Sequence, residues 1–126
     1  MTAVSFVERT GGVRVDLPSR PELLSVVRML VHTLAQQRHL DDERVEDVVL
    51  AVSEAATSVM DSNPVTVAWS ETEDAVTVEV SGGGAPSEDL SVPLIRALVD
   101  ALTIDAVEGR TTMTLVVACD PWEEPV

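Results

Sequence analysis

Apolar residues recur at helical spacing along one long segment of the chain, from Leu40 to Met60. Positions three and four apart lie on one side of a helix, so this spacing predicts a helix that faces a core. The apolar stripe consists of Val45, Val48, Val49, Val52, Ala56 and Val59. The opposite side carries Asp47, Glu54, Ser58 and Asp61, with Leu50 and Ala51 beside them. Such a helix can back a sheet and line a site, although an ordinary helix with a solvated face has the same pattern.

Capping and helix-breaking residues mark the ends of two helices. Asp41 or Asp42 can accept a hydrogen bond from the first turn of the long helix, and Pro64 stops it. Before it, a first helix is predicted from Ser19, as its N-cap, to about Arg38. The two helices therefore follow each other directly along the chain.

Several shorter segments alternate apolar and polar residues, which is the period of a half-buried strand. One hairpin turns at residues 11–12 and another at residues 71–74. Residues 81–90 form the Gly- and Pro-rich loop of the chain, and Pro93 after it suits the first turn of a third helix. The predicted strands are Val4–Glu8, Val13–Leu17, Val65–Ser70, Ala75–Val80, Leu102–Ala106 and Thr111–Ala118.

Charge narrows the choice of partner. The chain has 126 residues and a formal net charge of −14, and its eight basic residues are all arginine. An acidic surface repels phosphate backbones and anionic headgroups, so we expect neither nucleic acid nor membrane as a ligand. Aromatic residues that could stack on bases are few, namely Phe6, Trp69 and Trp122. The charge suits a basic protein partner, although solubility explains it equally well.

Length and cysteine usage predict one domain in a reducing compartment. We expect a single domain over residues 1–119 and an acidic tail over residues 120–126. Cys119 has no second cysteine to pair with, which fits the cytosol. No signal-peptide pattern and no run of about 18 apolar residues occurs, so we expect a cytoplasmic protein.

Three segments resemble motifs of a known family. The segment Ala51 to Val59 reads Ala-Val-Ser-Glu-Ala-Ala-Thr-Ser-Val. It resembles the N-box helix of the histidine kinase-like (GHKL) ATPases, in which the phrase ends Glu-Ala-x-Thr-Asn-Ala. Residues 92–100 are similar to the helix after the ATP lid of that family, and residues 109–118 to its closing G-T-T strand. The three occur in family order, and the chain looks most like the anti-sigma-factor serine kinases of bacterial stress and sporulation switches.

This resemblance implies a fold and an assembly. The expected fold is an α/β two-layer sandwich, a mostly antiparallel sheet with three helices on one face, which is the Bergerat fold of GHKL ATPases. The expected assembly is a homodimer, as in related regulators.

The resemblance also assigns nucleotide-binding positions, and several are altered. The family asparagine that holds magnesium corresponds to Ser58, whose hydroxyl is a poorer ligand for a hard cation but can still contribute. In the family's D-x-G-x-G motif, the aspartate that reads the adenine amino group corresponds to Gly82. Gly84 is kept and Pro86 replaces the second glycine. Because glycine has no side chain to accept a hydrogen bond, this implies loss of direct adenine recognition.

The phosphate positions precede the third helix. The family reads G-L-G-L-P there, so that backbone amides approach phosphates at a helix N-terminus. Residues 89–93 of this chain read Asp-Leu-Ser-Val-Pro. Asp89 would place a carboxylate beside a polyphosphate, and Ser91 replaces a glycine, while Thr111 keeps its place in the closing strand. The resemblance therefore implies a degenerate site with no cofactor, or ATP and magnesium if the site functions.

Glu54 is the exception, because it matches the family. In the kinases of the family this glutamate is the general base toward a serine hydroxyl, a role worth roughly 10²–10⁴-fold in rate. That role requires bound ATP. A glutamate retained for a hydrogen bond on the helix face explains the match as well.

Two functions therefore follow from the resemblance. The first is an anti-sigma-factor-like regulator, in effect a pseudokinase, that binds a sigma factor or another regulatory protein near residues 20–38. The second is an active ATP-dependent serine kinase that phosphorylates a small STAS-type antagonist protein, with Glu54 as its base.

Overall fold

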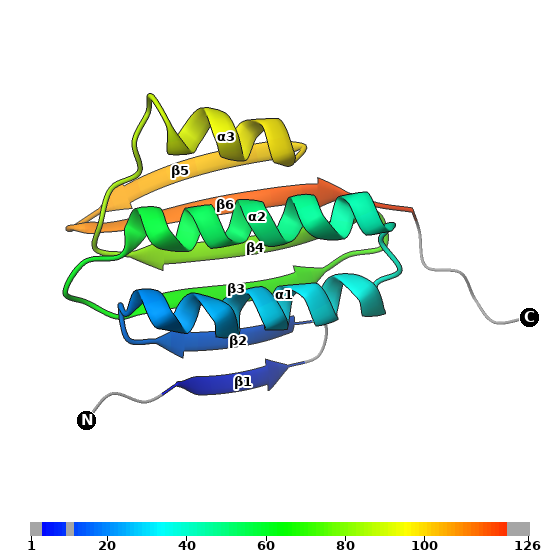
Figure 1. Ribbon diagram of the computed structural model, residues 1–126, viewed down its shortest axis with the longest axis horizontal. Helices are drawn as coiled ribbons and strands as arrows, with labels where there is room; N and C mark the ends of the chain where they lie inside the picture. Colours follow the sequence, from blue (N-terminus) through cyan, green and yellow to red (C-terminus); the bar gives the residue numbers. More distant parts are fainter. Residues whose placement is uncertain (1–3, 10–11, 121–126) are drawn as a thin grey trace, which may run out of the picture.

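Strands make up one of the two layers of the molecule. The computed structural model describes residues 4–9 and 12–120, and within them six strands form one sheet in which every neighbouring pair is antiparallel. The strands are β1 (Ser5–Arg9), β2 (Gly12–Leu17), β3 (Val65–Glu71), β4 (Ala75–Gly82), β5 (Ala101–Val107) and β6 (Arg110–Ala118). Their order across the sheet is β1-β2-β3-β4-β6-β5 (Figure 1), so β6 lies between β4 and β5.

The helices make up the other layer. Within the same described residues these are α1 (Leu24–Gln37), with the short 3-10 turn η1 (Pro21–Leu23) before it, α2 (Asp42–Val59) and α3 (Ser91–Leu98). All three α-helices lie on one face of the sheet, and α1 and α3 flank α2 in the opposite direction to it (Figure 1). The predicted two-layer α/β sandwich is confirmed.

The core between the layers is built mainly from valine. In β4, Val76, Val78 and Val80 are buried and alternate with more exposed residues. Val78 lies opposite Leu115 of β6, and Val80 lies opposite Met113. Branched side chains suit the extended backbone and pack well on a pleated surface. The alternation in the sequence thus places one face of each central strand against the helices.

The long helix begins where the sequence predicts. The Asp41 side chain accepts a hydrogen bond from the backbone N–H of Arg44 at 2.9 Å, so Asp41, not Asp42, is the N-cap. Asp42 and Glu43 follow in the first turn, where carboxylates interact favourably with the helix dipole. The helix ends at Val59, shortly before Pro64.

The exposed side of α2 is narrower than the sequence predicts. Ala51, expected beside the polar face, is completely buried, and the prediction for it was wrong. The reason is α3, which packs along that side of α2. At one end of this contact Ser91 meets Glu54, and at the other end Asp100, just beyond α3, pairs with Arg44.

The first helix also begins differently from the prediction. Ser19 does not cap it, because its hydroxyl donates a hydrogen bond to the backbone carbonyl of Asn63. Arg20 occupies the cap position of η1, and Leu23 that of α1. Ser19 instead links the chain before the first helix to the chain before β3.

Parts of two predictions lie outside the described residues. The predicted tail is described only at Asp120, with Trp122 beyond the described part, and Gly11 of the first hairpin turn is also outside it. Among the helices in residues 4–9 and 12–120, none has the length and apolar character to cross a bilayer.

Candidate functional site

Two of the predicted site residues lie one turn apart on α2. Glu54 and Ser58 are both half-buried. The Ser58 hydroxyl donates a hydrogen bond to the backbone carbonyl of Glu54 at 2.8 Å. Serine in a helix commonly makes this bond, which holds the hydroxyl against the helix backbone. The proton of Ser58 is therefore used within α2, and its oxygen lone pairs remain able to accept.

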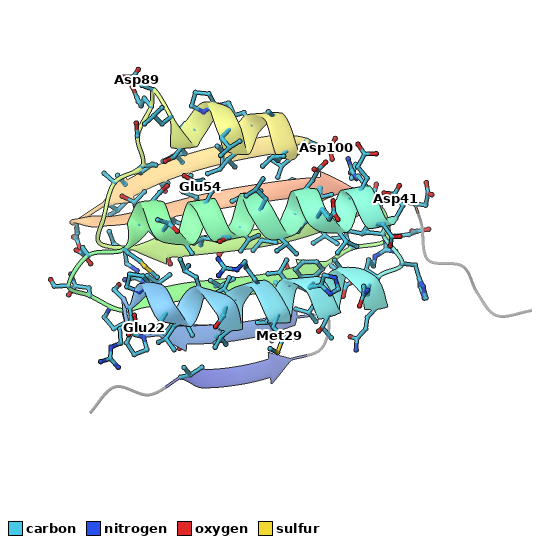
Figure 2. The ribbon with its side chains drawn as sticks, viewed as in Figure 1. Glu22, Met29, Asp41, Glu54, Asp89 and Asp100 are labelled. Atoms are coloured by element: carbon cyan, nitrogen blue, oxygen red, sulfur yellow. The ribbon has the colours of Figure 1, made fainter. Side chains whose placement is uncertain are left out.

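The Glu54 carboxylate reaches the start of α3. The Ser91 hydroxyl donates to Glu54 Oε1 at 3.3 Å, and Ser91 is the first residue of α3. Figure 2 shows Glu54 between α2 and α3. The positive end of the α3 dipole favours a negative charge at this place. Two predicted site residues far apart in the sequence are thus brought into contact.

The glycine-rich loop packs against the last turn of α2. The backbone N–H of Gly84 donates to the Val59 carbonyl at 2.8 Å, which satisfies one of the free carbonyls at the helix end. A Cβ on Gly82 would lie 2.4 Å from the Val59 carbonyl oxygen, and one on Gly84 would lie 2.7 Å from that of Met60. Real Cβ atoms essentially never approach another heavy atom to less than 3.0 Å. Both glycines are therefore required by close backbone packing.

A carboxylate covers the middle glycine. A Cβ on Gly83 would lie 2.1 Å from Oδ2 of Asp61. The Asp61 carboxylate is held in place by Asn63, whose backbone N–H and side-chain amide donate to it at 2.7 and 3.2 Å. This is the local turn that aspartate commonly stabilises through its own side chain. The sequence placed Asp61 on a helix face and gave no sign of this contact.

The closing strand completes the same end of the molecule. Thr111 of β6 lies directly opposite Gly82 of β4, and its side chain is buried. The structure therefore brings the predicted positions together around the C-terminal end of α2. These positions are Glu54, Ser58, Gly82, Gly84, Ser91 and Thr111. Within the described residues, no group of three or more His, Cys, Asp and Glu side chains is arranged to hold a metal ion.

Asp89 lies apart from this cluster. It is exposed at the tip of the loop before α3, and Figure 2 shows it pointing away from the body of the molecule. Ser87, which the sequence did not single out, holds this loop. Its hydroxyl accepts from the N–H of Leu90 at 3.2 Å, and its carbonyl accepts from the N–H of Val92 at 3.0 Å.

A second polar cluster lies at the other end of the contact between α2 and α3. The Asp100 carboxylate accepts from the backbone N–H of Ala118 at 2.7 Å and from Arg44 at 2.9 Å. The hydrogen bond from Ala118 has the larger effect and that from Arg44 the smaller, and both lower the pKa of Asp100 below its usual value. Nearby, burial raises the pKa of the Cys119 thiol. The sequence predicted neither the ion pair nor the shift.

Comparison with known proteins identifies the family. Residues 17–117 match the histidine kinase-like ATPase domain, so the chain belongs to this family. No curated protein sequence matches the chain. Thirteen chains of solved structures match. One contains the RsbU and RsbW domains of Rv1364c from Mycobacterium tuberculosis, with a TM-score of 0.70 and 21% sequence identity.

The likeness to that structure concerns the fold. The match covers 84% of this chain and 32% of the other, so the chain spans about a third of that protein's length. At this identity the comparison establishes a shared three-dimensional arrangement. The expected GHKL fold is confirmed by the family match and by this arrangement together.

Proposed function

We propose that this protein is an anti-sigma-factor-like regulator that acts by binding another protein and in which ATP binding is weak or lost. The family membership and the fold likeness to an RsbW domain support this class. So does the resemblance of the motifs to the anti-sigma-factor serine kinases. The partner is a sigma factor or another regulatory protein, and residues 20–38 are the expected contact region. We also propose that the protein is a cytoplasmic homodimer.

The close contact between Gly82 and the end of α2 carries the proposal. In the family, an aspartate at this position reads the adenine. Any side chain here would begin with a Cβ 2.4 Å from the Val59 carbonyl oxygen, a backbone atom that cannot rotate away. An adenine-reading carboxylate therefore does not fit unless β4 and α2 separate. The residues present supply no side-chain acceptor at this position.

The start of α3 departs from the family pattern as well. A phosphate group would use the backbone amides and the dipole of this helix end. Ser91 stands there in place of a family glycine, and its hydroxyl donates to the Glu54 carboxylate. This replacement supports the proposal, whereas Glu54 itself matches the kinases of the family.

Calorimetric titration with ATP and ADP, with and without magnesium, tests the proposal. We expect no heat of binding in the micromolar range. The variants Ser58→Asn and Ser91→Gly restore two family residues but leave Gly82 unchanged, so we expect no heat of binding from them either. A micromolar site in the natural protein that disappears when magnesium is removed would overturn the proposal.

An active serine kinase is the second candidate, and the position of Glu54 favours it. Its carboxylate lies beside the first residue of α3, where a general base for a partner's serine hydroxyl would be needed. The substrate in this case is a STAS-type antagonist protein, with ATP and magnesium as cofactors. Thr111 and Gly84 would then take part in nucleotide binding.

Substitution of Glu54 separates the two candidates. If the protein is a kinase, Glu54→Ala removes phosphate transfer to the antagonist, measured with radiolabelled ATP. If it acts by binding alone, the same variant keeps its affinity for its partner. Glu43→Ala, an exposed carboxylate in the first turn of α2, is the control and should leave phosphate transfer unchanged in either case.

A further inference from the structure

Each of the three α-helices exposes one large apolar side chain. Met29 of α1 is 71% exposed, Leu50 of α2 is 47% exposed and Leu94 of α3 is 39% exposed. Single exposed apolar residues are normal on a protein surface. Their positions relative to one another decide whether these three form a common surface.

Two hydrogen bonds fix how the helices lie along one another. Arg28 of α1 donates to the Ser53 hydroxyl of α2 at 3.0 Å. Ser91 of α3 donates to Glu54, the next residue of α2. Because α1 and α3 both run opposite to α2 (Figure 1), these two bonds bring all three helices into register at the same level of α2.

The three apolar residues therefore form a row across the helices. Met29 directly follows Arg28 in α1. Leu50 lies one turn before Ser53 and Glu54 in α2. Leu94 lies one turn after Ser91, the first residue of α3. In antiparallel neighbours, one turn back on α2 and one turn forward on α3 reach the same level. We call Met29, Leu50 and Leu94 the apolar row. Packed helices lie about 8–10 Å apart, which sets the spacing within the row.

The surroundings of the row are acidic. Glu46 and Asp47 lie one turn before Leu50, whereas Glu54, one turn after it, is hydrogen-bonded to Ser91. Within the described residues, neither Glu46 nor Asp47 forms an ion pair. Arg28 lies beside Met29 and donates to Ser53. The other two arginines of the three helices are directed away from the row, Arg44 to Asp100 and Arg96 to the Leu102 carbonyl.

We infer that this face of the helix layer binds a basic amphipathic helix of the partner protein. Residues seven apart on a helix are separated by about 10 Å, which matches the spacing of the apolar row. Such a helix, lying across α1, α2 and α3, can place an apolar residue on each member of the row. Its lysines and arginines then meet the carboxylates around Leu50. The inference rests on the proposed function and extends the expected contact region from α1 to α2 and α3.

Titration with a synthetic leucine–lysine peptide, patterned as an amphipathic helix, tests this surface. The protein carries 13C-labelled Met and Leu methyl groups, whose NMR signals report contact at each member of the row. We expect shifts at Met29, Leu50 and Leu94, and a tenfold or greater loss of affinity in the double variant Leu50→Ser/Leu94→Ser. The matched control is Val107→Ser, because Val107 is 59% exposed on β5, outside the helix layer. Circular dichroism verifies that each variant is folded.

The possible results either support the surface or overturn it. The surface is overturned if the peptide does not bind, or if its shifts spread over all the methyl groups. It is also overturned if the double variant and the control lose affinity for the peptide equally. Sedimentation measures whether the double variant still self-associates. A loss of self-association would mean that a second copy of the chain covers the apolar row, and would also overturn the inference. The nucleotide titration is an independent test. ATP binding would overturn the proposed function. If neither ATP nor the peptide binds, only the proposed surface is overturned.

Discussion

Replacing Gly82 with alanine tests the packing between β4 and the end of α2. The added methyl group would lie 2.4 Å from the Val59 carbonyl oxygen, so the strand and the helix end must separate by roughly 1 Å to reach ordinary contact. That movement would also weaken the hydrogen bond from the Gly84 N–H to the same carbonyl. The substitution therefore disturbs the candidate site and the stability together.

The magnitude follows from three contributions. Overpacking a tight site costs about 1–3 kcal/mol, and the weakened hydrogen bond costs about 1 kcal/mol. Alanine also lowers the entropy of the unfolded chain, which stabilises the folded protein by about 0.4–1 kcal/mol. The net expectation is a loss of about 2 kcal/mol. With an unfolding entropy of about 2.1 cal/mol/K per residue over the chain, the melting temperature should fall by about 8 °C.

Thermal unfolding followed by circular dichroism measures this change, with two other glycines as references. At Gly12 an added Cβ would lie 2.9 Å from the Trp69 carbonyl oxygen, so Gly12→Ala should have an intermediate effect. At Gly109, φ is 76° and nothing lies within 4 Å, so only backbone strain of about 1 kcal/mol is expected. If Gly82→Ala melts no lower than Gly109→Ala, the proposed packing of the loop on α2 is refuted.

Three further predictions concern stability. Asp41→Ala removes the N-cap of α2 and should cost about 1 kcal/mol in urea unfolding, whereas Asp41→Asn should cost much less. Asp100 has a lowered pKa, so its contribution to the free energy of unfolding is present above the usual carboxyl pKa and is lost as the pH falls through the lowered pKa. The free energy of unfolding of Asp100→Asn should therefore depend less on pH across that acidic interval. Within the described residues the buried indole N–H of Trp69 has no hydrogen-bond partner. Trp69→Phe removes this unsatisfied group, a gain of about 1–3 kcal/mol that offsets the loss of packed ring atoms, so the free energy of unfolding in urea should change by no more than about 1 kcal/mol. A loss above about 3 kcal/mol would contradict this reasoning.

Periodic patterns predicted most of the fold. The alternation in β3, β4 and β6 and the apolar stripe of α2 depend only on which side of an element faces the core. Asp41 could be recognised as a cap because the bond it accepts comes from three residues further along the same chain. The elements were therefore predictable wherever their signal was local.

The contacts that shape the candidate site were not predictable in this way. Ala51 is buried because α3 packs beside it, and Ser19 is drawn away from its helix by Asn63. The glycines at 82–84 indicated a turn, yet their absent side chains are required by the end of α2. Each of these features depends on a segment distant in the sequence, for which a single chain gives no periodic signal.

The place of β6 in the sheet has a consequence for the order of folding. β5 precedes β6 in the chain, and within the described residues its one partner is β6, which itself pairs with β4. Until β6 is in place, β5 has no partner and β4 exposes an open edge with its hydrogen-bonding groups free, a template for pairing with other chains. These pairings are distant in sequence for β4 and β6, and such contacts form slowly. The last strand therefore completes the sheet for two others, and a chain that stops before it exposes an edge prone to aggregation.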